Sequence, residues 1–169
     1  MKIVQNAWYM VTQRLVLDDL EEDAYELVAI HCAIPSYKLA FLLNKYLQMR
    51  FCRKRKDISF QHATINASYP YYQYIDTDHY TSYDLVKNTF HLKTENKNLQ
   101  QDLFETTKMV TKYLIPEHKK VDYFLKISAE TPSFSIKTLV SKVLQIPQII
   151  TAYSIPELQI KSKNNLIFE

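Results

Sequence analysis

The sequence predicts an α+β domain of two layers, with two main helices on one face of a mixed, mainly antiparallel sheet. The segments 36–50 and 136–144 repeat apolar residues at the three- and four-residue spacing of an amphipathic helix. The other apolar segments are shorter and rich in tyrosine, valine and isoleucine, which favour strands. The 169 residues suffice to bury a core and show no break in composition, so we expect a single domain over residues 1–169.

The first elements are expected to be two strands and a helix. The segment 14–18 (RLVLD) indicates a short strand, and 25–32 (YELVAIHC) indicates a longer one whose alternate side chains face opposite sides. Pro35 and Ser36 suit the first turn of a helix. The apolar repeat carries that helix to about Arg50.

The middle of the chain predicts a pair of strands between polar segments. Residues 57–70 are rich in turn-forming types, and we expect irregular structure there. Residues 71–75 and 83–92 have strand character and are joined around 75–82 (IDTDHYTS). Residues 93–102 are polar and predict a solvated loop.

The last third contains a strand, a helix and a strand in succession. Residues 109–115 and 121–127 indicate strands, the helix 136–144 follows, and 148–155 indicates a final strand. The unit 121–155 is therefore expected to be a βαβ unit with a right-handed parallel crossover, as in ferredoxin-like and small-molecule-binding regulatory folds. That likeness is one of fold and implies no function. The first half loosely echoes this order, which leaves an internal duplication open.

The chain contains no glycine, although average usage of about 7% would give roughly a dozen. Dinucleotide-binding fingerprints, phosphate-binding loops and nucleophile elbows all need glycine for tight turns or close backbone approach. The commonest nucleotide-dependent enzymes and serine hydrolases are thereby excluded. Positions with positive φ are expected to fall to Asn, Asp or His.

Charge and targeting signals indicate a cytoplasmic protein. The net charge of +3 is too small to indicate a nucleic-acid binder by itself. No apolar run reaches the roughly 18 residues of a membrane span, and no leader pattern is visible at the N-terminus. Cys32 and Cys52 fit a reducing compartment and give no disulfide framework.

The segment 114–127 (LIPEHKKVDYFLKI) carries a recognisable pattern. It resembles the IPExxxVDY family of bacterial proteins through six residues, Ile115, Pro116, Glu117, Val121, Asp122 and Tyr123. Further likeness lies in YELVAIH, YKLAFLLNKYL, YYQYID and IPQIITAYSI. The resemblance implies an intracellular, single-domain protein and supplies no reaction, cofactor or catalytic residue.

The residues of this segment predict a hairpin. Strands 109–115 and 121–127 are separated by the five residues PEHKK, a hairpin length, and Glu117 is expected to pair with Lys119 or Lys120 at an exposed tip. We expect the second strand to be central, with Tyr123, Leu125 and Ile127 facing the helix 136–144. Asp122 is expected to be an anchor that accepts backbone amides; the alternative is an exposed recognition residue.

No local pattern indicates a catalytic, cofactor or metal site. His31 and Cys32 are adjacent in a strand and must project to opposite faces, so they form no dyad. A calcium loop from Asp76 lacks the central glycine and has Lys87 where a bidentate Glu is needed. A phosphatase-like DTD at this point is too short to argue from, and Asp76 and Asp78 are expected to bind local backbone amides. The histidines show no zinc-binding spacing.

The sequence contains one dense cluster of basic residues, which consists of Arg50, Arg53, Lys54, Arg55 and Lys56. Such a run is usually a solvated end of a helix, but it can also form an edge that binds RNA phosphates or an acidic protein, with nearby tyrosines stacking on bases. The leading hypothesis is a non-catalytic protein that binds another protein or a copy of itself, and the alternative is an RNA-binding protein. The third hypothesis is an enzyme, because residues distant in sequence can still assemble into a catalytic cluster.

Overall fold

The computed structural model describes residues 25–62, 65–95, 107–129 and 135–168. The strand expected at 14–18 and most of the loop expected at 93–102 lie outside these ranges. Neither helix within them is long and apolar enough to cross a membrane.

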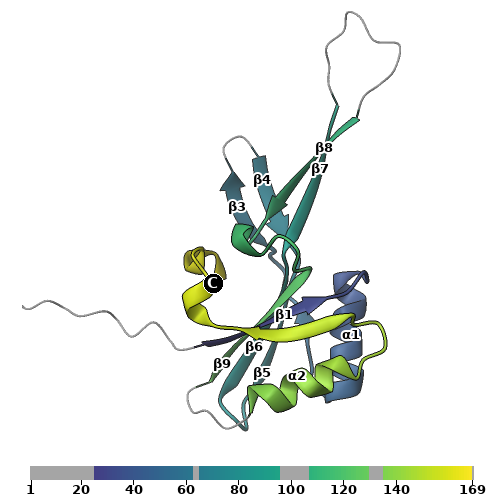
Figure 1. Cartoon of the computed structure of the whole chain (residues 1–169), viewed down its shortest axis with the longest axis vertical. Coiled ribbons are helices and arrows are strands. Elements are labelled where there is room, and N and C mark those ends of the chain that lie inside the picture. Colours follow the sequence, from purple (N-terminus) through teal and green to yellow (C-terminus); the bar gives the residue numbers. More distant parts are fainter. Residues whose placement is uncertain (1–24, 63–64, 96–106, 130–134, 169) are drawn as a thin grey trace, which may run out of the picture.

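A six-stranded antiparallel sheet with two helices forms the body of the protein, which confirms the predicted α+β class (Figure 1). Helices α1 (Ser36–Leu47) and α2 (Ile136–Leu144) pack on the sheet and contact one another. In spatial order the strands are β10 (Thr151–Ile155), β1 (Tyr25–His31), β9 (Tyr123–Ala129), β6 (Thr81–Lys87), β5 (Tyr71–Asp76) and β2 (Cys52–Arg53).

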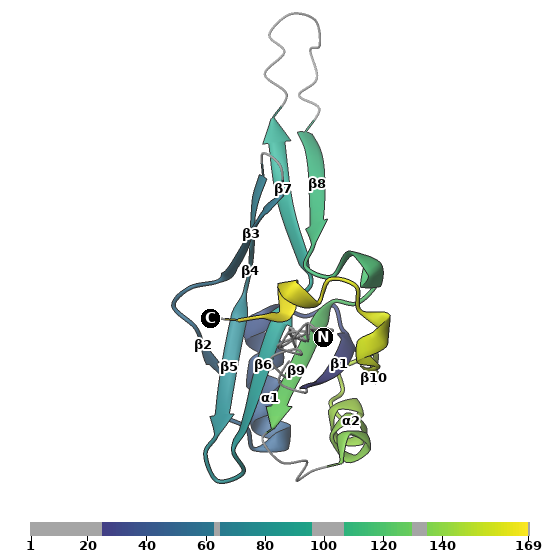
Figure 2. The same ribbon diagram turned by 90° about the vertical axis from the view of Figure 1, so that its left-hand side faces the viewer.

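Two further hairpins project from one end of the sheet (Figures 1 and 2). One pairs β3 (Ile58–His62) with β4 (Ile65–Tyr69), and the other pairs β7 (Thr89–Glu95) with β8 (Thr107–Tyr113). The expectation of irregular structure at 57–70 was wrong. The polar residues there alternate with apolar ones, so the turn-forming types occupy one face of a hairpin. Three short 3-10 helices, η1 (Pro116–His118), η2 (Glu157–Gln159) and η3 (Lys163–Leu166), complete the fold.

The sheet is buried on both faces, and its central strands divide their side chains between two cores. Tyr123, Leu125 and Ile127 of β9 belong to the core that contains Leu139 and Val143 of α2, as predicted. The second core, on the other face, is closed by the chain after β10 and by residues that flank η1. Its buried members are Leu27, Ala29, Ala67, Tyr69, Val86, Leu114, Ile115, Val121, Phe124, Ile155, Ile160 and Leu166.

The strand connections differ from the sequence prediction in two places. Strand β8 pairs with β7, not with β9, so the predicted hairpin of 109–115 with 121–127 was wrong. Strands β9 and β10 run in the same direction around α2, but β1 lies between them and is antiparallel to both. The unit is therefore a split βαβ, and the sheet is antiparallel throughout, not mixed.

Without glycine, other residues take the left-handed backbone conformation. Within the described ranges these are Gln48 (φ 57°) and Tyr80 (φ 48°), so the expectation of Asn, Asp or His was wrong. Gln48 lies directly after α1 and ends it before Arg50, the predicted end. A left-handed residue at this position is a common way to stop a helix.

Replacing Leu125 by Ala is expected to reduce the free energy of unfolding by about 2–5 kcal/mol, because the side chain is fully buried and its loss leaves a cavity. Urea unfolding followed by circular dichroism measures this. Thr77→Ala, at the exposed tip between β5 and β6, is the matched control and should change stability by less than about 0.5 kcal/mol. Equal effects of the two changes would contradict the assignment of Leu125 to the core.

Candidate functional site

The buried side chain of Asn88 organises the region around the sequence signature. Asn88 lies between β6 and β7 and is 0% exposed. Its Nδ2 donates to the carbonyls of His118 and Val121, both at 2.9 Å, and its Oδ1 accepts from the amide of Ile115 at 2.9 Å. Its backbone amide donates to the carbonyl of Asp122 at 2.9 Å. We call Asn88 with residues 114–123 the Asn88 junction.

Two signature residues in the junction hold the connection between β1 and α1. The carboxylate of Asp122 accepts the amide of Cys32 at 3.0 Å, and the hydroxyl of Tyr123 donates to the carbonyl of Ile34 at 2.6 Å. Asp122 is half-buried, and because its carboxylate accepts a backbone amide it acts as the expected anchor. Its own amide donates to the carbonyl of Ile30 at 3.3 Å. These contacts fix the start of α1 relative to β9.

Glu117 binds the C-terminal segment and not the neighbouring lysines, so its predicted pairing with Lys119 or Lys120 was wrong. Its carboxylate accepts the amides of Lys161 and Ser162, at 2.6 and 2.7 Å, and the Ser162 hydroxyl at 3.0 Å. Burial raises the pKa of Glu117, but these hydrogen bonds outweigh it and hold the pKa below its usual value of 4.5. The reason for the difference is η1, which replaces the predicted hairpin tip and begins at Pro116.

Of the remaining signature residues, Ile115 and Val121 are fully buried in the second core, and Pro116 is exposed at the start of η1. The six signature residues thus lie in one segment beside Asn88. Hydrogen bonds from this segment hold the β1–α1 connection and the C-terminal segment in place. The sequence reasoning missed Asn88, although a polar residue that interrupts YDLVKNTFHL was the available signal.

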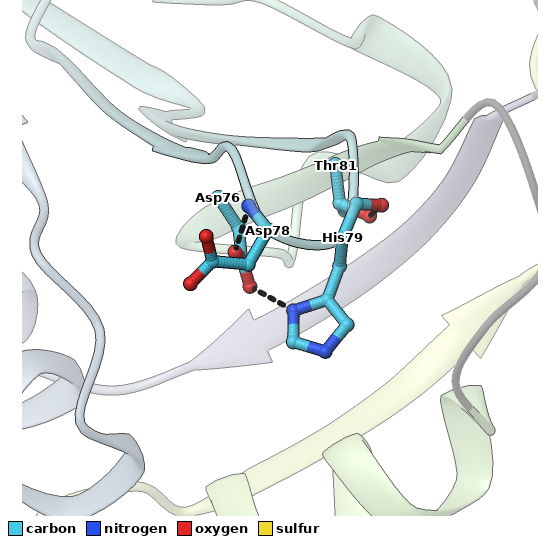
Figure 3. Close-up of polar contacts among 4 residues, drawn as sticks. All are labelled: Asp76, Asp78, His79 and Thr81. Carbon is cyan, nitrogen blue, oxygen red and sulfur yellow. Dashed lines mark hydrogen bonds and ion pairs between the residues drawn. The ribbon is translucent and has the colours of Figure 1, made fainter.

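The tip between β5 and β6 is an exposed turn closed by its own polar groups (Figure 3). Asp76 accepts the amide of Asp78 at 3.2 Å and contacts Nδ1 of His79 at 2.9 Å, while the hydroxyl of Thr81 donates to the carbonyl of His79 at 2.9 Å. The hydrogen bond from His79 lowers the pKa of Asp76. Asp76 binds a backbone amide as expected; Asp78 contributes its own amide, and its carboxylate points away from the turn (Figure 3).

His31 and Cys32 face opposite sides of the sheet, as predicted. Cys32 is buried in the core beneath the helices, and burial raises the pKa of its thiol to about 11. His31 stacks on Tyr153 of β10, with ring centroids 5.7 Å apart, and its Nε2 lies 3.3 Å from the Tyr153 hydroxyl. Across the described ranges, no group of three or more His, Cys, Asp or Glu residues could hold a metal ion.

The sequence pattern also did not predict that Asp84 of β6 is buried. Asp84 is 5% exposed, and one of its oxygens accepts the hydroxyl of Tyr71 at 2.7 Å and the side-chain amide of Gln73 at 2.9 Å. Burial and the neighbouring carboxylate raise the pKa of the Tyr71 hydroxyl, which remains a donor to Asp84. The contacts join β5 to β6 and lie within the sheet, so we assign them a structural role.

The basic run occupies one edge of the sheet. Arg50, Arg53, Lys54, Arg55 and Lys56 are all exposed, and they surround β2, an edge strand of two residues. Arg53 forms an ion pair with Asp57 and lies over the ring of Tyr72, 5.4 Å from its centroid. Lys54 donates to the side chain of Gln73 at 3.0 Å.

The tyrosines near this edge are already engaged. Tyr72 is 7% exposed and covered by Arg53, and Tyr74 stacks on Tyr83 with ring centroids 5.5 Å apart. The ring of Tyr72 is therefore largely covered, and the stacking of strand tyrosines on bases stays a prediction.

The opposite edge of the sheet is β10, which differs from β2 in length and in charge. Its five residues, TAYSI, include no charge and no proline. Thr151, Tyr153 and Ser154 are exposed, and Ile150 just before the strand is 74% exposed. Within the described part of the chain, β10 pairs with β1 alone, so its outer side carries backbone groups without a neighbouring strand.

Comparison with known proteins finds no match among protein families, curated proteins or solved structures.

The Glu117 contacts predict a pH dependence of stability. The folded pKa lies below 4.5, so the stabilisation is present above about pH 4.5 and is lost as the pH falls through the folded pKa. Glu117→Gln should lower Tm relative to the wild type at about pH 7, and the difference should shrink towards about pH 3. Glu26→Gln, at an exposed position near the start of β1, is the control, and its Tm difference should not follow that of Glu117→Gln. A Glu117→Gln difference independent of pH would contradict the role of the ionised carboxylate.

Proposed function

We propose that this protein is a non-catalytic cytoplasmic protein that acts by binding another protein chain, and that β10 is the binding edge. The observation that carries the proposal is the open, uncharged edge strand TAYSI at the end of the six-stranded sheet. The outer backbone amides and carbonyls of such a strand can form a ladder with a strand from a partner.

The contrast between the two edges supports this assignment. Natural sheets protect exposed edges from unwanted pairing by shortening them and by placing charges, especially lysine, along them. Strand β2 has both protections, with two residues and five cations around it. Strand β10 has five residues and no charge, so it has neither of these protections against pairing with a strand of another chain.

A non-catalytic role agrees with how the polar groups inside the protein are used. Asn88, Asp122 and Tyr123 bind backbone groups, and Asp84 binds Tyr71 and Gln73. We also propose kinship with the IPExxxVDY family; its support is that five of the six matching residues, all but Pro116, make hydrogen bonds to Asn88, to the β1–α1 connection or to the C-terminal segment.

The proposal is tested by affinity capture from the cell in which the protein is native. Wild type, Thr151→Lys/Ser154→Lys and the control Ser59→Lys, on the exposed side of β3, are each immobilised. Lysines on an edge strand disfavour pairing, so a protein retained by wild type and control should be reduced at least about tenfold on the double variant. Retention of the same proteins by all three would rule out β10 as the binding edge.

RNA binding is a second candidate, favoured by the five exposed cations around β2. The variant Arg53→Glu/Lys54→Glu/Arg55→Glu should then lose at least about tenfold in RNA affinity, and wild-type affinity should fall steeply with salt. Lys119→Glu/Lys120→Glu, exposed in the Asn88 junction, is the control. Affinity that does not change with salt, measured by fluorescence anisotropy, would dispose of this candidate.

A further inference from the structure

We propose that the partner of β10 is a second copy of the same chain, joined antiparallel through β10 so that two six-stranded sheets become continuous. This inference rests on the proposed function, because it assigns the partner of the same edge. Three features support it: the self-complementarity of β10, the charges at the other edge, and the exposed apolar residues near the strand.

An antiparallel pair of identical strands is two-fold symmetric, so each residue meets the residue equally far from the centre on the other copy. With Tyr153 at the centre of Thr151–Ile155, Tyr153 meets Tyr153 and Thr151 meets Ile155 of the second copy. Like charges directly opposite each other destabilise a sheet, and β10 has no charge to oppose. The strand is therefore compatible with itself along its whole length.

The central pair is a favourable one. Tyr153 lies opposite Ala29 in the register, on the face of the second core, where its ring stacks on His31. Pairing two copies would place two tyrosine rings side by side on that face, each supported by its own His31. Aromatic cross-strand pairs stabilise an antiparallel sheet.

Exposed apolar residues lie near β10 on both faces of the sheet, since Tyr153 is on the face of the second core and α2 covers the other face. Leu144 ends α2 and is 47% exposed, Ile150 is 74% exposed, and Tyr153 is 42% exposed. Helix α2 packs against β10 (Figure 1). A two-fold axis perpendicular to the sheet puts α2 of both copies on the same face. The joined edge would then bring the two Tyr153 side chains together on one face and the two α2 helices towards each other on the other face.

The other edge cannot take this role. Pairing β2 with β2 would bring two basic runs together, and a pairing of β10 with β2 would use only two residues. A contact between unlike edges also repeats from copy to copy and makes an open chain, whereas the β10 pair closes with two copies. The distribution of charge thus favours a dimer.

Complementary charges at the symmetry centre test the inference. Tyr153→Lys and Tyr153→Glu each place like charges opposite one another and should be monomers of 20.0 kDa, while the wild type should have twice that mass by light scattering. An equimolar mixture of the two variants should recover the dimer, because Lys then faces Glu. The matched pair Ser59→Lys and Ser59→Glu on β3 should remain dimeric separately.

A second variant keeps the test independent of the His31–Tyr153 contact. Thr151→Lys/Ser154→Lys leaves that contact intact and should also be monomeric, with a Tm by circular dichroism that shows a folded chain. A wild type that stays monomeric up to about 100 μM, or a dimer that survives in all the β10 variants, would overturn the inference.

The outcomes separate this inference from the proposed function. If the wild type is monomeric but still retains a protein that Thr151→Lys/Ser154→Lys loses, the second copy is the wrong partner and the binding edge stands. If the wild type is monomeric and retains no such protein, both fail.

Discussion

The buried amide of Asn88 is the interaction on which most of the architecture depends. Its side chain lies where β6 ends and β7 begins, and it satisfies three backbone groups of the passing segment 114–121. A buried backbone group without a partner costs about 1–3 kcal/mol, so the segment is held where Asn88 meets it. With the segment held there, the β7–β8 hairpin projects from the sheet and the chain re-enters the sheet as β9. Strand β9 contributes side chains to both cores.

The signature residues extend that constraint in two directions. Asp122 and Tyr123 fix the connection that leads into α1, and therefore the layer above one face. Glu117 holds the segment that carries Ile160 and Leu166 over the other face. The six-residue pattern is thus explained by assembly of the two cores. The polar groups of the junction bind other groups of the same chain.

Local periodicity predicted β1, α1, α2 and the division of β9 between two faces, because each depends on residues near in sequence. It could not predict that β8 pairs with β7. The five residues between β8 and β9 fit a hairpin, and the deciding contact comes from Asn88. Glu117 likewise finds its partners at Lys161 and Ser162, far along the chain. The basic run was visible in composition, but the edge position of β10 follows only from the order of all six strands.

The two edges of the sheet share one backbone geometry and differ in side chains, and that difference determines what assemblies the sheet permits. At β2 the cations repel a second copy, and Arg53 covers Tyr72, so the strand offers little area to pair with. At β10 an uncharged strand meets no such penalty. If both edge strands could pair with other copies, the sheet could extend into an open assembly. If charges prevent pairing at β2, each copy can pair with only one other copy, through β10. The charges at β2 are therefore what would make pairing at β10 a closed assembly of two copies.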